Sequence, residues 1–220
     1  MDKFGYVRGI SDTVYEKNKE AADAESKLVI EAMSEDKISF MTENGILHMV
    51  PVNKIPFGKF RDKSIPVDNI STIDTTSDVI LHAEVMDAPK EFIIVTNMGG
   101  VKRVSSVELA VKGKNTKYIK LKDNEVCTDV MEMKPDMDIV FVSESGRFLR
   151  IKAEDIPLKK RAAVPAVGIS LKDDETVSDI FVVNGTEAED YELQLKNGKQ
   201  ILLSKVAKGK RGGRGILKKL

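Results

Sequence analysis

The chain has 220 residues, of which 41% are hydrophobic and 32% charged, as expected for a folded protein with its own core. Its 35 basic and 35 acidic residues balance, which excludes a uniformly basic surface but not a segregated one. No apolar run is long enough to span a membrane, and the N-terminus lacks the pattern of a secretory signal. The single cysteine, Cys127, excludes an internal disulfide framework and a thiolate zinc site, so we expect a cytoplasmic protein.

The first 35 residues read as an incomplete repeat. FGYVRGI (4–10) is typical of the second strand of a β-hairpin, with Gly5 in the place that Gly99 occupies later. Residues 16–33 contain few β-branched residues in their first half and predict either a short helix or an ordered loop. The opening strand of this repeat is missing, which suggests that the chain is an excised fragment.

Four later segments share one pattern: an alternating apolar strand, a polar turn that closes on glycine, and a second alternating strand. This pattern predicts β-hairpins. Glycine suits the turn because the backbone there needs a positive φ. The segments are 36–50, 91–104, 138–151 and 190–203, with turn glycines Gly45, Gly99, Gly146 and Gly198.

A second element repeats with a similar period. YIKLKDNE (118–125) returns as GISLKDDE (168–175), fifty residues later. A period near fifty residues with about four strands per unit is typical of propeller-like arrays, in which neighbouring units complete each other's core. We therefore expect an all-β fold, a single domain of about four to five four-stranded blades, with approximate repeat boundaries at 1–35 (partial), 36–89, 90–136, 137–188 and 189–220 (partial).

Basic residues gather at the strand ends and in the connections between hairpins. Cations spaced along a curved face can bind duplex DNA without reading bases, because each neutralised phosphate releases condensed counterions. A Lys-Arg pair at a strand end is more often solvated surface, and KGKRGGRGILKKL (208–220) alone could equally be a disordered basic tail. The candidate phosphate contacts are Lys102, Arg103, Lys112, Lys114, Arg147, Arg150, Lys159, Lys160, Arg161, Lys205, Lys208, Lys210, Arg211, Arg214, Lys218 and Lys219.

Several of these motifs resemble a known family. FGYVR (4–8), TNMGGVKR (96–103), IPFGKFRDKSIPVDNIS (55–71) and the glycine-rich KGKRGGRG (208–215) are similar to the C-terminal domain of the A subunit of bacterial type IIA topoisomerases, gyrase and topoisomerase IV. The resemblance implies a β-pinwheel whose blades exchange strands and whose basic rim bends duplex DNA. It also implies a non-catalytic domain without a cofactor. Its partners would be double-stranded DNA, the ATPase B subunit of the enzyme, and the rest of the A subunit, at the bacterial nucleoid.

The chain departs from the gyrase pattern in two places. In gyrase the glycine-rich basic box follows the first hairpin, whereas here the corresponding stretch, YEKNKEAADAE (15–25), is acidic and lacks glycine. The box-like KGKRGGRG lies in the last repeat, which looks more like topoisomerase IV; its glycines would let the backbone approach phosphates. No segment with a catalytic tyrosine resembles the cleavage domain, so we expect that this chain does not cleave DNA by itself.

Two other function classes are compatible with a propeller-like fold. The first is a free-standing scaffold that binds a protein, which the zero net charge supports. The second is a hydrolase, which would need converging carboxylates that the sequence does not offer. His48 and His82 lie in strand-like sequence and read as ordinary strand residues. The acidic runs at 123–125 and 173–175 lack the ligand spacing of a calcium loop and read as turns between blades.

Overall fold

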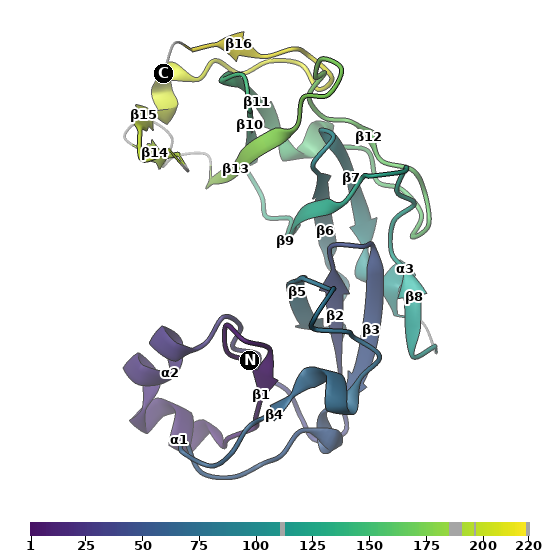
Figure 1. Cartoon of the computed structure of the whole chain (residues 1–220), viewed down its shortest axis with the longest axis vertical. Coiled ribbons are helices and arrows are strands. Elements are labelled where there is room, and N and C mark those ends of the chain that lie inside the picture. Colours follow the sequence, from purple (N-terminus) through teal and green to yellow (C-terminus); the bar gives the residue numbers. More distant parts are fainter. Residues whose placement is uncertain (111–112, 185–190, 196, 219–220) are drawn as a thin grey trace. The chain divides into compact units, whose positions relative to one another are not determined.

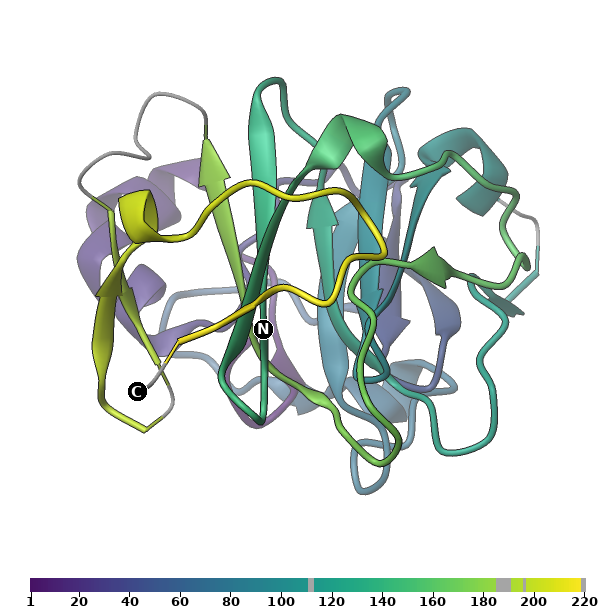
Figure 2. The same cartoon turned by 90° about the horizontal axis from the view of Figure 1, so that it is seen from above.

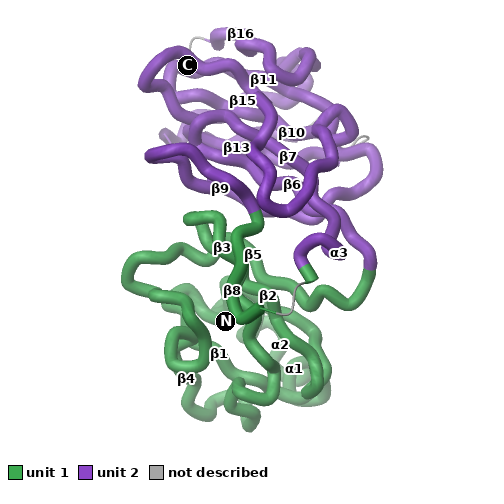
Figure 3. The backbone as a smooth tube through the Cα atoms, turned by 90° about the vertical axis from the view of Figure 1, so that its right-hand side faces the viewer, with its two compact units in different colours: residues 1–88, 110–118 green, residues 89–109, 119–220 purple. Residues whose placement is uncertain are grey.

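The computed structural model describes residues 1–110, 113–184, 191–195 and 197–218. Its backbone divides into two compact units, which Figure 3 colours separately: unit 1 comprises residues 1–88 and 110–118, and unit 2 comprises residues 89–109 and 119–220. Strands dominate both units (Figure 1). Among the described residues, no helix combines the length and hydrophobicity that a membrane span would need.

The four predicted hairpins are present. Each turn closes on its predicted glycine, and the four φ values are +80°, +74°, +79° and +81°, the region that favours glycine. The hairpins are β2 (Lys37–Thr42) with β3 (Ile46–Pro51), β6 (Glu91–Thr96) with β7 (Gly100–Ser105), β10 (Met137–Ser143) with β11 (Arg147–Lys152), and β14 (Glu192–Gln194) with β15 (Gln200–Leu202).

Three of these hairpins lie at the centre of four-stranded antiparallel sheets, ordered β5-β2-β3-β8, β12-β7-β6-β9 and β13-β10-β11-β16, and β1 pairs with β4 in a two-stranded sheet. The longer added strands are β5 (Ile80–Val85), β9 (Cys127–Glu132) and β13 (Val177–Asn184). The short ones are β1 (Tyr6–Val7), β4 (Ile65–Pro66), β8 (Asn115–Lys117), β12 (Ala166–Val167) and β16 (Ile216–Leu217).

The blades exchange strands. β8 follows β7 in the chain but pairs with β3, β12 follows β11 but pairs with β7, and β16 follows β15 but pairs with β11. The last of these pairings can be followed at the yellow end of the chain in Figures 1 and 2. Each connection after a hairpin therefore completes the sheet of the preceding hairpin. Single-turn 3-10 helices begin several of these connections, at Val52–Lys54, Ala153–Asp155 and Leu203–Lys205, and another, Val67–Ile70, follows β4.

Of the two alternatives for residues 16–33, a short helix or an ordered loop, the structure shows helix in the first part of the segment, starting before residue 16 and ending at Glu25. Two short helices, α1 (Asp12–Lys17) and α2 (Lys19–Glu25), occupy the segment, and Ser11 caps the first by accepting a hydrogen bond from the Val14 amide. Beyond Ser26 the backbone is extended and runs beside the N-terminus, where the Lys27 amide donates to the Met1 carbonyl at 2.9 Å. The apolar side chains that follow pack against the core of unit 1, which favours strand-like backbone over helix. A third short helix, α3 (Ser106–Leu109), follows β7.

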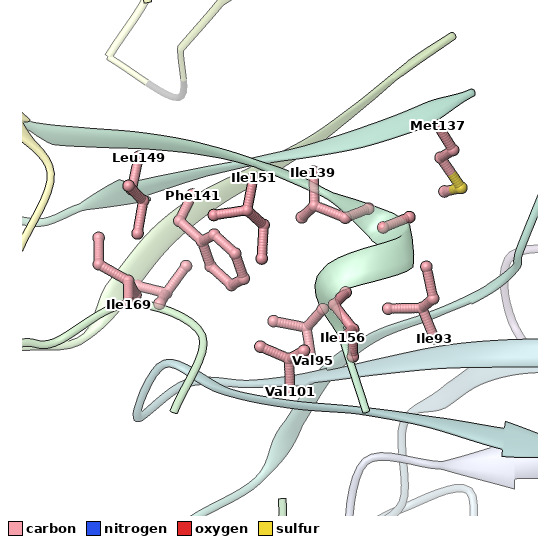
Figure 4. Close-up of a cluster of buried hydrophobic side chains, with 12 residues drawn as sticks. Ile93, Val95, Val101, Met137, Ile139, Phe141, Leu149, Ile151, Ile156 and Ile169 are labelled. Carbon is pink, nitrogen blue, oxygen red and sulfur yellow. The ribbon is translucent and has the colours of Figure 1, made fainter. Parts of the chain in front are cut away.

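The sheets of unit 2 complete each other's core. Figure 4 shows Ile139 and Phe141 of β10 beside Ile151 of β11, facing Ile93 and neighbouring side chains of the preceding sheet. The alternate residues of β10, Val140 and Val142, contribute to a second cluster with the last hairpin. β10 is thus buried on both faces, as expected for stacked blades. Unit 1 has its own core, with Val7, Ile38, Phe40, Val50 and Val67 among its buried residues.

Candidate nucleic-acid interface

Three segments of unit 2 lie side by side because backbone hydrogen bonds join them. The Lys120 amide donates to the Ala163 carbonyl at 3.3 Å. The Ser170 amide donates to the Gly213 carbonyl at 2.9 Å, and the Gly212 amide donates to the Gly168 carbonyl at 2.7 Å. We call the surface formed by residues 119–122, 157–172 and 204–218 the connector band, because each segment connects one hairpin to the next strand or follows the last hairpin.

The connector band is rich in cations. Residues 157–172 carry four basic residues and residues 204–218 carry six, with no acid in either segment. The nearest acids along the chain, Asp155 and Asp173, lie just outside. A charge of one sign on adjoining segments gives a local positive potential although the whole chain is neutral.

The predicted phosphate contacts divide by exposure. Those exposed in the band are Lys160, Lys205, Lys208, Lys210 and Arg214. Those partly exposed in unit 2 are Arg103, Arg147, Lys159, Arg161, Arg211 and Lys218. Lys114 is exposed but belongs to unit 1, and Lys112 and Lys219 lie outside the described residues.

Two predicted contacts are wrong. The Lys102 side chain is fully buried, and its Nζ donates to the carbonyl oxygens of Lys160, at 3.1 Å, and Arg161. Arg150 is also buried and its Nε donates to Asp138 Oδ2 at 2.7 Å. Both residues lie on central strands that are covered on both faces, so neither side chain can reach a phosphate in this structure. A strand pattern read from sequence does not reveal that the second face is covered.

Other cations of the set have partners within unit 2. Arg103 donates from Nε to the Ile156 carbonyl at 2.6 Å and forms an ion pair with Glu91 at 3.1 Å. Arg211 donates from Nε to the Asp155 carbonyl at 3.1 Å and from Nη1 to the Val167 carbonyl at 2.8 Å. These guanidinium groups hold the connectors in place. The side chains of Lys160, Lys210 and Arg214, in contrast, make no hydrogen bond or ion pair with any residue that the structure describes.

Lys208 connects the band to the sheet β13-β10-β11-β16. Its Nζ lies 2.9 Å from Asp138 Oδ2, the same carboxylate oxygen that binds Arg150, and its side chain is half-exposed. The buried Asp138 is thus shared by two cations. Lys208 therefore offers less free positive charge than its exposure suggests.

The glycines of KGKRGGRG are needed for packing. A Cβ on Gly209 would lie 2.7 Å from Leu149 Cδ1, and a Cβ on Gly215 would lie 2.6 Å from the Phe148 carbonyl oxygen. Gly212 and Gly215 also have positive φ, +80° and +68°. From the sequence, we expected these glycines to let the backbone approach DNA phosphates. In the structure, the absence of a Cβ at Gly209 and Gly215 lets the segment pack closely against β11.

Burial affects the pKa of Lys102. Removal from water, the largest cause, and the nearby positive charges of Lys159 and Arg161 lower this pKa from 10.5 to about 8, while Cys127 and Glu108 oppose the shift. Carbonyl oxygens rather than a carboxylate accept its hydrogen bonds. The ammonium group of Lys102 therefore binds the backbone of the basic segment 159–161.

Three exposed lysines of the band, Lys120, Lys122 and Lys172, are absent from the predicted phosphate contacts. The repeated Leu-Lys-Asp at 121–123 and 171–173 could have identified the last two, because equivalent places in successive repeats occupy equivalent positions on the blades.

The acidic runs close the hairpin turns. Glu125 Oε1 accepts a hydrogen bond from Thr96 Oγ1 at 2.7 Å, and Glu175 accepts from the Ser145 hydroxyl. Hydrogen bonds from Ser143 and Ser145 lower the pKa of Glu175 to about 2. Both runs therefore lie at turns between strands, as predicted. Among the described residues, no group of three His, Cys, Asp or Glu side chains is placed to hold a metal ion.

The histidines are strand residues. His48 lies in β3 with its Nδ1 2.8 Å from Thr72 Oγ1, and burial lowers its pKa. His82 lies in β5, 3.8 Å from Glu84.

Unit 1 has a different kind of surface. A hollow of about 1030 Å³ is lined by residues between Met1 and Ser64, and Phe4 and Phe57 are largely exposed at it. Its lining includes Asp12, Glu16 and Glu25, and acids outnumber bases. This hollow is therefore unsuited to a phosphate backbone.

Repeated four-stranded sheets that exchange an outer strand define an all-β pinwheel. The family model described as the DNA gyrase C-terminal domain, beta-propeller, matches residues 90–131 and 138–184. The solved C-terminal domain of DNA topoisomerase IV has a TM-score of 0.85 at 20% identity, covering 99% of this chain and 70% of that one. The E. coli ParC C-terminal domain has a TM-score of 0.77 at 15% identity, covering all of this chain and 92% of that one.

Curated relatives agree with the family match. The A subunit of DNA topoisomerase 4 from Streptococcus pyogenes is 24% identical over 89% of this chain, and that from Streptococcus pneumoniae is 25% identical over 98%. The A subunit of DNA gyrase from Mycoplasma pneumoniae is 28% identical over 72%. The chain spans 24%, 28% and 19% of these proteins, less than a third of their length. The resemblance to the C-terminal domain of type IIA topoisomerase A subunits is confirmed.

Proposed function

We propose that this chain binds duplex DNA through the connector band, without reading its sequence, and bends it in support of the A subunit of a topoisomerase IV-like enzyme or of gyrase. ATP-dependent cleavage and strand passage would reside in other domains of that protein and in the B subunit. The observation that carries the proposal is the band itself: its three segments hold twelve basic residues and no acidic residue, and backbone hydrogen bonds join them.

Non-specific binding follows from the kind of groups that the band presents. Among the described residues, the side chains without a partner in the band include Lys160, Lys210 and Arg214, cations suited to phosphate oxygens. The described helices α1, α2 and α3 have six, seven and four residues, and none lies in the band, so its described residues offer no α-helix to insert into the major groove. Phosphate contacts position a protein on DNA without carrying sequence information.

Bending follows from the repeat. The segments of the band complete successive sheets, because β12 joins the sheet of β7 and β16 joins the sheet of β11. A duplex that contacts both segments has to follow the rotation from one sheet to the next. Smooth bending of a short duplex costs on the order of 1–6 kcal/mol, which several phosphate contacts can offset.

The test is binding of the chain to linear duplex DNA across a salt series. The informative variant replaces Lys160, Lys210 and Arg214 by Gln, since these side chains lack structural partners among the described residues. Three lost contacts should make the slope of log K against log salt shallower by roughly 3. The matched control replaces the exposed Lys17, Lys37 and Lys134, which lie outside the band, and should keep the wild-type slope.

No binding by the wild-type chain at low salt would overturn the proposal. Equal losses in the two triple variants would also overturn it, because the net charge rather than the band would then determine affinity. Salt-insensitive binding to a protein partner would favour the scaffold alternative.

A further inference from the structure

We infer that Lys102 is a positioning residue for DNA binding: from beneath the connector band, it holds the backbone of Lys160 and Arg161 in the arrangement that meets phosphates. This inference rests on the proposed function. It concerns a residue that is itself inaccessible to DNA, because the Lys102 side chain is fully buried.

The first argument is where the ammonium group places its hydrogen bonds. A buried charge is costly unless it is hydrogen-bonded. Lys102 Nζ donates to the carbonyl oxygens of Lys160 and Arg161, two consecutive residues of the basic segment. A second contact holds the same segment, since the Lys159 amide donates to the Arg103 carbonyl at 2.9 Å. The segment is therefore fixed to β7 at its most basic point.

The second argument comes from the repeats. Three connectors cross the preceding strand at an equivalent place, marked by the isolated parallel bridges Gly9–Phe57, Arg103–Leu158 and Arg150–Lys208. The residue just before each crossing lies three positions after a glycine of positive φ that precedes its strand, Gly5, Gly99 or Gly146. These residues are Arg8, Lys102 and Leu149.

These three residues support the connectors by two different means. Arg8 Nη1 lies 3.4 Å from the Asp62 carbonyl oxygen, so a cation reaches a carbonyl of the connector in unit 1 as Lys102 does in unit 2. Leu149 instead contacts the glycine-rich segment, where a Cβ on Gly209 would lie 2.7 Å from its Cδ1.

The type of residue at this position, lysine at 102 and leucine at 149, differs with the composition of the connector that crosses it. Residues 157–167 contain no glycine, and the Lys102 ammonium binds two of their carbonyl oxygens, those of Lys160 and Arg161. Residues 208–215 contain four glycines and pack directly on an apolar side chain. If core packing alone were needed beneath residues 159–161, an apolar residue would serve, as Leu149 does. The charge of Lys102 is therefore best explained by the carbonyl groups that it orders.

Ordering these two residues before binding should raise affinity. A connector that is already fixed loses less conformational entropy when its cations meet phosphates. Without Lys102, Lys160 and Arg161 keep their charge but lose their fixed backbone. Their contribution to DNA binding should therefore fall although neither residue has changed.

The test combines Lys102→Met with single band variants in the salt-series assay. Lys102→Met keeps most of the side-chain volume but cannot donate a hydrogen bond. We expect it to weaken DNA binding about threefold to tenfold and to make the salt slope shallower by about one to two. Combined with Lys160→Gln, it should cause a smaller further loss than it causes alone, because one of the two cations that Lys102 positions is then already absent. Combined with Lys210→Gln, in the other segment, the two losses should multiply.

The outcomes separate the two proposals. A wild-type chain that does not bind DNA contradicts the proposed function. If the wild-type chain binds DNA and Lys102→Met binds equally well, this inference is contradicted. It is also contradicted if the loss from Lys102→Met multiplies equally with the losses from Lys160→Gln and from Lys210→Gln. A general loss of fold stability would give that second result, because it would not distinguish the two segments.

A measurement on the wild-type chain covers the case in which Lys102→Met does not fold. Hydrogen exchange of the Lys159 and Ala163 amides, which donate to the Arg103 and Lys160 carbonyls, should already be slow without DNA and should change less than about twofold when DNA binds. A tenfold or greater gain in protection would show that the segment orders only on binding, which would overturn the inference.

Discussion

Replacing Gly215 by Ala should destabilise unit 2, for two reasons that add. Its φ of +68° costs a side chain about 1–2 kcal/mol. The added Cβ would also lie 2.6 Å from the Phe148 carbonyl oxygen and 2.9 Å from the carbonyl carbon. These are backbone atoms that cannot rotate away, and overpacking of this kind costs about 1–3 kcal/mol. We expect a loss of about 3 kcal/mol in the free energy of unfolding.

The structure supplies a matched control. Gly212 has a similar φ, +80°, but its added Cβ would find its nearest atom, the Val167 carbonyl oxygen, at 3.8 Å. Gly212→Ala should therefore show only the conformational cost, about 1–2 kcal/mol. The difference between the two variants isolates the clash with β11.

Thermal and urea denaturation followed by circular dichroism would measure both variants. A loss of about 3 kcal/mol corresponds to a fall of roughly 6–12 °C in Tm for a chain of this size. The Gly215 variant should also lose the pairing of β16 with β11, which begins one residue later. Equal stabilities of the two variants would refute the claim that the glycine-rich segment is shaped by its contact with β11.

Three further outcomes follow from buried or hydrogen-bonded charges. The pKa of Lys102 in the folded state, about 8, lies below the ordinary 10.5, so the unfolded state binds more protons between these two pH values. The free energy of unfolding should therefore rise with pH across that window. Parallel denaturation series should show that Lys102→Met removes this rise. Ser145→Ala should raise the pKa of Glu175 from about 2 towards its ordinary 4.5, as a carboxyl NMR titration would show, so that stability is lost at a higher pH on acidification; an unchanged titration would contradict the assigned cause. Asp138→Ala leaves Arg150 without its buried carboxylate and should cost about 3–5 kcal/mol in denaturant unfolding, whereas a loss below about 1 kcal/mol would contradict the assigned ion pair.

The hairpins were predictable because their signals are local. Alternating apolar residues and a turn glycine identify each one, and Gly45, Gly99 and Gly146 lie at the turns where they were expected. The short exchanged strands were not predictable residue by residue. β12 and β16 have two residues each, too few to show a period, and their partners lie in the preceding repeat.

The basic residues show the same limit. Lys102 and Lys160 are both lysines in a basic stretch, yet one is buried and the other exposed. Which of them is free depends on the connector that crosses β7, a contact between residues more than fifty positions apart. The sequence of residues 16–33 left a short helix and an ordered loop open, because the extended backbone after Ser26 depends on its pairing with the N-terminus.

The connector band is tested most directly by measuring which lysines DNA covers. Acetylation of the wild-type chain, with and without duplex DNA at low salt, would be quantified for each lysine by mass spectrometry. We predict that Lys160, Lys205 and Lys210 react several-fold more slowly with DNA present, while the exposed Lys17 and Lys37 of unit 1 react at unchanged rates. Protection spread evenly over all exposed lysines, or confined to unit 1, would contradict the band as the DNA-binding surface.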